Sequence, residues 1–195
     1  NKHGHFYSSK EFDLGKLMNS GLSIMELGRS CVMPNYRAGP VLQLLWQGIA
    51  DYVSTNNIDI MFGCASLHST DIDHLAQPLS YMYHNHLAPE DIRPRALDDR
   101  YIDMNILPPD QINEKAVFSD LPPLIKGYLR VGAVIGDGAV IDPQFNTTDV
   151  CIIAQSHHVT GRYRKHYERK IEKEIPSRRK EQQMDKNLAI AKGTA

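Results

Sequence analysis

The clearest pattern of apolar and polar positions falls on residues 41–53, where apolar side chains recur every three or four residues and predict an amphipathic helix. Pro40 suits the first turn of this helix, because the N–H that proline lacks would have no partner there. Asn56 and Asn57 end the periodic stretch. The apolar members of the pattern are Val41, Leu42, Leu45, Trp46, Ile49, Tyr52 and Val53.

Apolar runs on both sides of this helix predict strands, over residues 23–33 and 58–67. Pro34 ends the first strand, and the second is apolar nearly throughout, as expected of a strand that is buried on both faces. Strand, helix and strand in this order predict a parallel pair joined by a right-handed crossover. The N-terminus of the helix would then point at the loop before it, and its unpaired N–H groups and positive dipole end favour a phosphate.

Weaker patterns predict the elements before and after this unit. Residues 12–22 are expected to form a short helical or irregular stretch whose apolar side chains, Met18 included, pack inward. Ser69 or Thr70 can cap a further helix, which Pro78 kinks or interrupts. The segment after that helix, residues 88–123, combines acidic residues with prolines and predicts a loop with short elements.

Two further strands are predicted over residues 126–135, where side chains alternate, and 149–155, which is apolar. Gly136-Asp137-Gly138 is expected to form the turn between them. Together with the parallel unit, these elements predict an α/β (α+β) fold with a mixed sheet flanked by helices. We expect one domain over residues 1–165 and a basic tail, helical or disordered, over residues 166–195.

The composition is that of an ordinary soluble protein, because 195 residues that are 42% hydrophobic and 23% charged can bury one core. No apolar run approaches the roughly 20 residues that span a bilayer, and the N-terminus lacks the order of a signal peptide, so we expect a cytoplasmic location. The chain begins with Asn1 rather than methionine, which predicts a processed chain or a fragment.

Cysteine and histidine give no metal signature. Cys31, Cys64 and Cys151 stand far apart without CxxC spacing and are expected to be buried free thiols in a reducing compartment. The nine histidines include two close pairs, and neither has a third ligand at a recognisable spacing. We therefore predict no metal site.

The formal net charge of -1 divides unevenly along the chain. Residues 160–195 carry 11 Lys+Arg and 5 Asp+Glu, a net charge of +6, whereas the remainder carries -7. This asymmetry predicts a basic tail that binds an acidic partner or places the protein peripherally at the inner membrane. The alternative is a solvated helix with a charged face. A nucleic-acid partner is not expected.

Glu26 and Arg29 lie on the predicted strand before the long helix. Residues three apart on a strand face opposite sides unless a bulge intervenes, and Gly28 permits such a bulge. A splayed or bulged strand leaves backbone N–H groups unpaired, and these can bind a thioester carbonyl or a developing oxyanion. The alternative is an ordinary ion pair in a partly buried sheet.

A second motif, His68 followed by Asp73 with four residues between, matches the His-x4-Asp arrangement of glycerolipid acyltransferases, in which the histidine takes a proton from an attacking hydroxyl. The chain has no Pro-Glu-Gly phosphate motif of the kind that those enzymes carry further on. A helix cap with acidic residues in the first turn is the favoured alternative.

Five separate segments resemble, in order, the bacterial ornithine lipid N-acyltransferases, which were long labelled haemolysin-like and belong to the GNAT acyltransferase superfamily. The resemblance runs from about Phe6 to His166. The segments are Phe6-Tyr7-Ser8-Ser9-Lys10-Glu11-Phe12-Asp13-Leu14, Glu26-Leu27-Gly28-Arg29-Ser30-Cys31-Val32, Leu45-Trp46-Gln47-Gly48-Ile49, Phe62-Gly63-Cys64-Ala65-Ser66 and Gly127-Tyr128-Leu129-Arg130-Val131-Gly132-Ala133.

The resemblance implies that a 3-hydroxyacyl group passes from acyl carrier protein to the α-amine of ornithine, which is the first step of ornithine lipid synthesis. The donor would be the acyl-phosphopantetheine of the carrier, and no cofactor is expected to be bound permanently. Two rival functions stay open. One is an acyl-homoserine-lactone or other N-acyl-amino-acid synthase, and the other is a non-catalytic truncated remnant that binds a carrier protein or a membrane.

The resemblance also suggests roles for individual residues. The Glu26-x-x-Arg29 pair is similar to a pair in acyl-homoserine-lactone synthases, where the glutamate is a proposed base. Because an α-amine is largely protonated at neutral pH, Glu26 is expected to free it for attack. Arg29 would orient Glu26 or bind the carboxylate of the amino acid, and Asp103 and Arg130 are candidate substrate-binding residues.

The segment between the strand and the long helix is expected to hold the donor. Backbone amides near Cys31 and Val32 would stabilise the oxyanion, and Arg37 with the amides of Gly39 to Val41 would hold the phosphate. The pyrophosphate loop of the superfamily, Arg/Gln-x-x-Gly-x-Gly/Ala, would put glycine at position 40 and glycine or alanine at 42, where this chain has proline and leucine. This difference disfavours CoA and suits a carrier with a single phosphate.

The superfamily fold places helices and strands ahead of the strand that carries Glu26, whereas 22 residues precede Ser23. The expected fold is therefore a GNAT-like mixed sheet flanked by helices that lacks the N-terminal strands.

Overall fold

The computed structural model describes residues 5–29, 31–36 and 41–156. The chain divides into two compact units, residues 1–159 and 160–195, and the second lies outside the described residues. The domain boundary at residue 165 and the basic tail therefore stay predictions.

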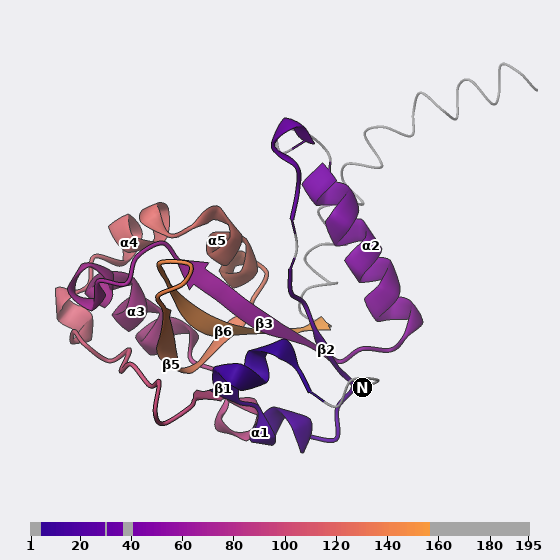
Figure 1. Cartoon of the computed structure of the whole chain (residues 1–195), viewed down its shortest axis with the longest axis horizontal. Helices are drawn as coiled ribbons and strands as arrows, with labels where there is room; N and C mark the ends of the chain where they lie inside the picture. The colour runs from indigo at the N-terminus through magenta and orange to yellow at the C-terminus, as the bar shows by residue number, and fades with distance from the viewer. Residues whose placement is uncertain (1–4, 30, 37–40, 157–195) are drawn as a thin grey trace, which may run out of the picture. The chain divides into compact units, whose positions relative to one another are not determined.

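The described part of the chain contains both strands and helices, which alternate until α4 is followed by α5 and β5 by β6 (Figure 1). The strands are β1 (Phe12–Asp13), β2 (Ile24–Glu26), β3 (Ile60–Leu67), β4 (Arg95–Ala96), β5 (Val134–Asp142) and β6 (Thr147–Gln155). The α-helices are α1 (Gly15–Met18), α2 (Val41–Thr55), α3 (Ile72–His86), α4 (Glu114–Asp120) and α5 (Pro123–Arg130). The short 3-10 helices are η1 (Tyr7–Lys10), η2 (Pro34–Tyr36), η3 (Glu90–Ile92) and η4 (Pro109–Gln111). None of the described helices has the length and apolar character that crossing a membrane requires.

The strands form one sheet in the order β1-β4-β5-β6-β3-β2. β2 pairs with β3 in parallel, as the strand-helix-strand pattern predicts, and the long strands β3, β6 and β5 pair antiparallel with one another. β4 pairs in parallel with β5 and antiparallel with β1. The prediction of a mixed sheet flanked by helices is confirmed. Ahead of β2, the described residues contribute to this sheet only the two-residue strand β1.

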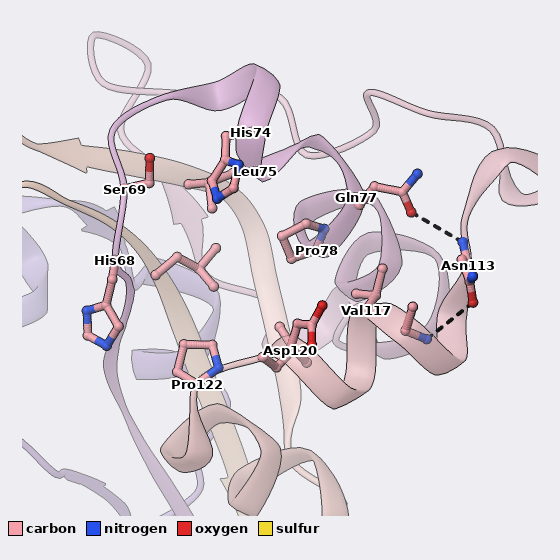
Figure 2. Close-up of a pocket in the computed structure, with 13 residues that line it drawn as sticks. His68, Ser69, His74, Leu75, Gln77, Pro78, Asn113, Val117, Asp120 and Pro122 are labelled. Atoms are coloured by element: carbon pink, nitrogen blue, oxygen red, sulfur yellow. Dashed lines mark hydrogen bonds between the residues drawn. The ribbon is translucent and has the colours of Figure 1, made fainter.

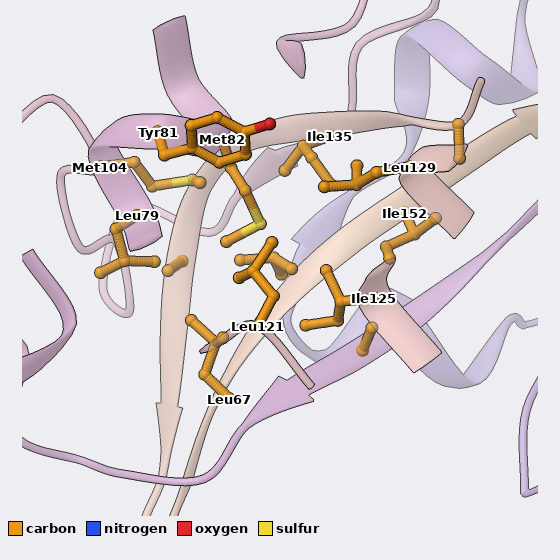
Figure 3. Packing of buried hydrophobic residues seen from close by; sticks show 14 of the residues in the cluster. Leu67, Leu79, Tyr81, Met82, Met104, Leu121, Ile125, Leu129, Ile135 and Ile152 are labelled. Carbon is orange, nitrogen blue, oxygen red and sulfur yellow. The ribbon is translucent and has the colours of Figure 1, made fainter. Parts of the chain in front are cut away.

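One face of this sheet packs against α3, α4 and α5. Alternate residues of a strand point to opposite faces, and Met61, Ala65 and Leu67 of β3 all point to this one. The helices contribute buried side chains that include Leu79, Met82, Val117, Ile125 and Leu129. Figure 3 shows Ile135 and Ile152 of the sheet among the same cluster of packed side chains.

The N-terminal segment covers the opposite face. Phe12, Leu14 and Leu17 are fully buried and pack in one cluster with Phe62 and other residues of that face. The inward packing that the sequence predicts for this stretch is confirmed for these three side chains. It is wrong for Met18, which is 55% exposed at the end of α1.

The structure corrects the strand predicted over residues 126–135. Its first half is the end of helix α5, which begins at Pro123, and strand β5 begins only at Val134. Ile125 and Leu129, four residues apart, are both buried. That spacing fits one face of a helix. The alternation that suggested a strand covers too few residues to distinguish the two-residue period of a strand from the 3.6-residue period of a helix.

Gly136-Asp137-Gly138 is also not the predicted turn, because it lies inside β5, where the pairing with β6 is irregular between Ile135 and Ala139. Gly138 has a φ of +81°, and a Cβ there would meet the ring of Tyr101 at 2.3 Å. Glycine is therefore required by close packing inside a strand.

Helix α3 differs from its prediction in two details. Asp71 caps it instead of Ser69 or Thr70, because the Asp71 side chain accepts hydrogen bonds from the backbone N–H groups of Asp73 and His74 at 3.0 and 3.2 Å. Pro78 does not interrupt the helix, which runs from Ile72 to His86.

Candidate active site

Strands β2 and β3 begin as a parallel pair and then part. Their pairing ends with Glu26 opposite Phe62, and the Leu27 N–H still donates to the Phe62 carbonyl at 2.7 Å. β3 continues as far as Leu67, paired only with β6 on its other side. The splayed strand that the sequence analysis weighed at Gly28 is thus present directly after Glu26.

Both carboxylate oxygens of Glu26 accept hydrogen bonds from the 3-10 turn η1. The backbone N–H of Tyr7 donates to Oε2 at 2.7 Å, and the backbone N–H and hydroxyl of Ser8 donate to Oε1 at 2.7 and 2.5 Å. Glu26 is half-buried and shares its strand face with Ile24. A carboxylate has about four lone-pair sites, so roughly one is left for a further partner.

Arg29 follows the end of β2 and is exposed. Its φ of +53° is unusual for a residue other than glycine. Its guanidinium carbon lies 5.2 Å from the centre of the Tyr7 ring, a cation–π contact. Glu26 and Arg29 therefore meet at the same short segment, the carboxylate at the backbone of Tyr7 and the guanidinium at its ring. They do not form the ion pair that was the alternative.

A small cavity opens where β2 and β3 part. Leu27, Gly63, Cys64 and Tyr128 are among the residues that line it. Tyr128 of α5 also makes an edge-to-face contact with Trp46 of α2, with ring centres 5.5 Å apart. Burial raises the pKa of Tyr128, so its phenol keeps its proton at neutral pH. Tyr128 belongs to a segment of the family resemblance, but its position at this cavity was not predicted from the sequence.

The residues expected to hold the donor are described only in part. Cys31 is exposed, which corrects the prediction that all three thiols are buried, and Val32 is half-buried. Val41 is the first residue of α2. Arg37 and Gly39 lie outside the described residues, so the proposed phosphate contacts stay predictions.

The two candidate substrate-binding residues lie elsewhere. Asp103 is exposed and accepts a hydrogen bond from the N–H of Asn105 at 2.8 Å. It follows Ile102, which bridges to Ala139 of β5, and β5 is three strand spacings, about 14 Å, from β2. The exposed Arg130 lies over the ring of Phe118 at 5.4 Å. The structure brings neither beside Glu26, and substrate binding by these residues stays a prediction.

A larger pocket of about 460 Å³ lies at the start of α3, between the loop that follows β3 and helix α4 (Figure 2). His68, His74 and Asp120 are among its lining residues. Asp73, the partner in the His-x4-Asp motif, does not line it and instead occupies the first turn of α3. The prediction that Asp73 is an acidic residue in the first turn of a helix is therefore confirmed, and the residue that caps the helix is Asp71.

A chain of polar side chains leads from Glu26 along the sheet face that the N-terminal segment covers. The sulfur of Cys64 lies 3.5 Å from Ser8 Oγ and 3.3 Å from Glu11 Oε2, and its single proton can be donated to one of these oxygens at a time. Burial raises the pKa of Cys64, so the thiol keeps its proton and acts as the donor. Burial also raises the pKa of Glu11, against the effect of the Cys64 hydrogen bond, and the negative charge of Asp149 adds to the rise.

The comparisons with known proteins agree with this picture. A family model described as "Acetyltransferase (GNAT) domain" matches residues 1–47, which contain η1, β2 and the start of α2. The chain is 43% identical over 169 residues to an L-ornithine N(alpha)-acyltransferase of Rhodobacter capsulatus, which covers 87% of this chain and 64% of the relative. It is 48% identical over 164 residues to the enzyme of the same name from Brucella abortus, with 83% and 58% covered.

This chain is a homologue of the L-ornithine N(alpha)-acyltransferases. A third relative of that name, from Rhizobium meliloti, is 44% identical over 166 residues, which are 84% of this chain and 56% of the relative. The family resemblance drawn from the sequence is thus confirmed. The homologue spans less than two thirds of the length of these curated relatives. The search of solved structures gives no significant match.

The hydrogen-bond partners of Glu26, and the side chains that contact those partners in turn, were not predicted from the sequence. Ser8, Cys64 and Glu11 lie in quoted segments of the resemblance, yet their contacts join positions more than 50 residues apart. Contacts of that range depend on how the N-terminal segment lies on the sheet. The one sequence signal was the presence of Ser8 and Glu11 in the first quoted segment.

Proposed function

We propose that the chain is the part of an acyl-carrier-protein-dependent N-acyltransferase that transfers a 3-hydroxyacyl group to the α-amine of ornithine. The observation that carries this proposal is the 42–48% identity to four curated L-ornithine N(alpha)-acyltransferases over most of the chain. The match of the GNAT acetyltransferase model to residues 1–47 supports acyl transfer. The amino-acid acceptor follows from the names of these relatives, and the carrier protein follows from the resemblance.

Glu26 is the base in this proposal. Its carboxylate removes a proton from the α-ammonium of ornithine, directly or through water, and the free amine attacks the thioester carbonyl. The C–N bond forms to give a tetrahedral oxyanion, whose collapse breaks the C–S bond, and the leaving thiolate of phosphopantetheine takes up the second proton that the attacking amine loses. Three donors from Tyr7 and Ser8 hold the carboxylate in one orientation and leave about one lone-pair site to accept the proton.

The donor lies along the gap where β2 and β3 part. Backbone amides near Cys31 and Val32 stabilise the oxyanion, and the start of α2 at Val41, with Arg37 and Gly39, holds the single phosphate. The small cavity lined by Leu27 and Gly63 supports this placement, because it opens at the point where the two strands separate. Arg29 binds the carboxylate of ornithine in place of, or beside, its contact with Tyr7.

The product test uses 3-hydroxyacyl carrier protein thioesters with a panel of amino acids, and mass spectrometry of the lipids formed. We expect an N-acylated ornithine, and we expect acetyl-CoA to give no product. If another amino acid is acylated instead, the ornithine assignment fails while acyl transfer stands. Should neither this chain nor one extended at its N-terminus acylate any amino acid, the enzyme proposal itself is wrong, and a binding role is favoured.

The basic residues 160–195 give the protein a further proposed property, a reversible contact with the inner face of the cytoplasmic membrane. Their net charge of +6 is attracted to anionic lipid, and the attraction weakens as salt is added. Vesicle sedimentation of the full chain and of a chain that ends at residue 159 tests this. Equal binding of both chains to anionic vesicles at low salt would dispose of it.

A further inference from the structure

Three carboxylates from distant parts of the sequence converge beside the N-terminal segment. Glu11 precedes strand β1, Asp142 ends β5, and Asp149 lies within β6. One ligand atom from each lies within 4.8 Å of the other two. Glu11 and Asp149 are only 7% and 8% exposed, and Asp142 is half-buried.

The negative charge of this carboxylate cluster is not balanced within the described residues. No described lysine, arginine or histidine forms an ion pair with Glu11, Asp142 or Asp149. Among the described residues, the positive charge of Arg100 lowers the pKa of Glu11, but its guanidinium donates to the carbonyl of Lys10 at 2.9 Å. An unpaired buried carboxylate is destabilised by several kcal/mol, so proteins normally keep such groups paired or bound to a metal.

A separate observation points to a ligand. Asp149 Oδ1 is buried and has no hydrogen-bond partner, and the same is true of Thr147 Oγ1. Thr147 lies two residues before Asp149 on β6, so both side chains point to the same sheet face, and Thr147 is directly opposite Asp142 in the pairing with β5. Native proteins leave few buried polar atoms without a partner, and here one belongs to the carboxylate cluster itself while the other, Thr147 Oγ1, lies on the same strand face, which points to a bound ligand.

We propose that Glu11, Asp142 and Asp149 bind a hard divalent cation of the size of Ca²⁺, with Thr147 Oγ1 as a further oxygen beside it. Carboxylate and hydroxyl oxygens are the donors that such ions take, whereas zinc sites are built mainly from cysteine and histidine. Ca²⁺ holds oxygen ligands at about 2.3–2.6 Å, so ligands on opposite sides of it are about 5 Å apart. The spacing within the cluster fits that span. The smaller Mg²⁺ would need a tighter arrangement or bound waters.

The cation would tie together three segments that only the fold brings close: the N-terminal segment, the end of β5 and strand β6. Glu11 also accepts the hydrogen bond from Cys64, which lies beside Ser8, the donor to Glu26. Binding would therefore order the turn that positions Glu26. The cation site itself does not depend on the proposed acyltransferase function. It also departs from the prediction of no metal, which considered only histidine and cysteine.

The test is calcium binding by the full chain after EDTA treatment and desalting, followed by isothermal titration calorimetry and thermal unfolding. We expect saturable binding of Ca²⁺ that raises the midpoint of unfolding with its concentration, and weaker binding of Mg²⁺. Asp149→Asn should reduce calcium affinity at least tenfold. Asp91→Asn, at an exposed carboxylate outside the cluster, should bind Ca²⁺ as the unmodified chain does.

Asp142→Asn is the second variant, because it lies at the more exposed end of the cluster and perturbs the core less than Asp149→Asn does. It should also lose at least tenfold in calcium affinity. Absence of any heat or thermal shift at millimolar Ca²⁺ overturns the proposal, and so does equal affinity in both variants and the unmodified chain. A thermal shift that ornithine produces and Ca²⁺ does not, lost in Asp149→Asn, would also overturn it and assign the cluster to the ammonium of the substrate.

Discussion

The backbone carbonyl of Leu27 lies directly against Gly63, so closely that a Cβ at position 63 would stand 2.2 Å from the carbonyl oxygen. Because Gly63 has no side chain, the backbone of Leu27 can lie against β3 just before the two strands separate. In this position the N–H of Leu27 donates to the carbonyl of Phe62 at 2.7 Å. This contact fixes the position of the cavity proposed for the donor.

Gly63→Ala should separate the two strands, because the methyl group cannot fit against a backbone oxygen that has no rotamer to change. We expect a loss of about 1–3 kcal/mol in the free energy of unfolding, measured by urea titration, and a fall in transfer rate. Gly48→Ala is the matched control, since a Cβ there meets nothing within 4 Å on the exposed side of α2. It should leave stability unchanged or raise it by up to about 1 kcal/mol. A Gly63→Ala protein as stable as the Gly48→Ala protein would show that the strands part without this contact.

Glu26→Gln should reduce the rate of acyl transfer by roughly 10²–10⁴-fold, the usual contribution of a general base. The amide also turns an N–H₂ group toward a backbone donor, so part of any effect is structural. Ser8→Ala separates the two contributions, because it removes the 2.5 Å hydroxyl contact and keeps the carboxylate. We expect Ser8→Ala to change stability and keep most of the rate. Equal rates for Glu26→Gln and Ser8→Ala at matched folded fraction would remove Glu26 as the base.

Stability should fall at mildly acidic pH because of His86. Burial lowers the pKa of His86 below its ordinary 6.5, with the charge of Glu114 opposing the shift, and its Nε2 lies 3.2 Å from the Tyr81 hydroxyl. The unfolded chain then binds more protons than the folded chain below about pH 6.5, so stability is lost as pH falls from there toward the folded pKa. His86→Gln should flatten this part of a stability curve measured between pH 5 and 8. The exposed His74→Gln should not, and a curve unchanged by His86→Gln would contradict the assignment.

Ser80→Ala should destabilise the packing of α3 against the segment that follows Met104. Ser80 is fully buried, and its hydroxyl accepts from the backbone N–H groups of Ile106 and Leu107 at 3.2 and 2.9 Å. Removing one acceptor leaves two amides without their partner, so we expect a loss of about 1–3 kcal/mol by urea unfolding. Ser119→Ala, at an exposed serine, serves as the control. A loss no larger than the control's would mean that water replaces the hydroxyl.

The sequence by itself determined the parallel unit of β2, α2 and β3 at one edge of the sheet, although β2 ends at Glu26 and not at the predicted residue 33. Helix α2 and strand β3 lie close to where the periodicity puts them, because an amphipathic helix of four turns and a strand buried on both faces each carry many positions of one period. The resemblance to the ornithine lipid N-acyltransferases was also recognised at this level, since several separate motifs occur in order. Glu26 and Arg29 were proposed as site residues by the same route, and their roles in acyl transfer stay predictions.

Only the tertiary structure decided which side chains and backbone groups contact Glu26 and Arg29. The backbone of Tyr7 and Ser8 reaches Glu26 across 19 and 18 positions, and the three carboxylates of the proposed calcium site span residues 11 to 149. No local period records such contacts, because they depend on how the N-terminal segment lies across one face of the sheet. The end of α5 was mistaken for a strand for a related reason, since a stretch of eight residues holds too few turns to distinguish the two periods until packing selects one.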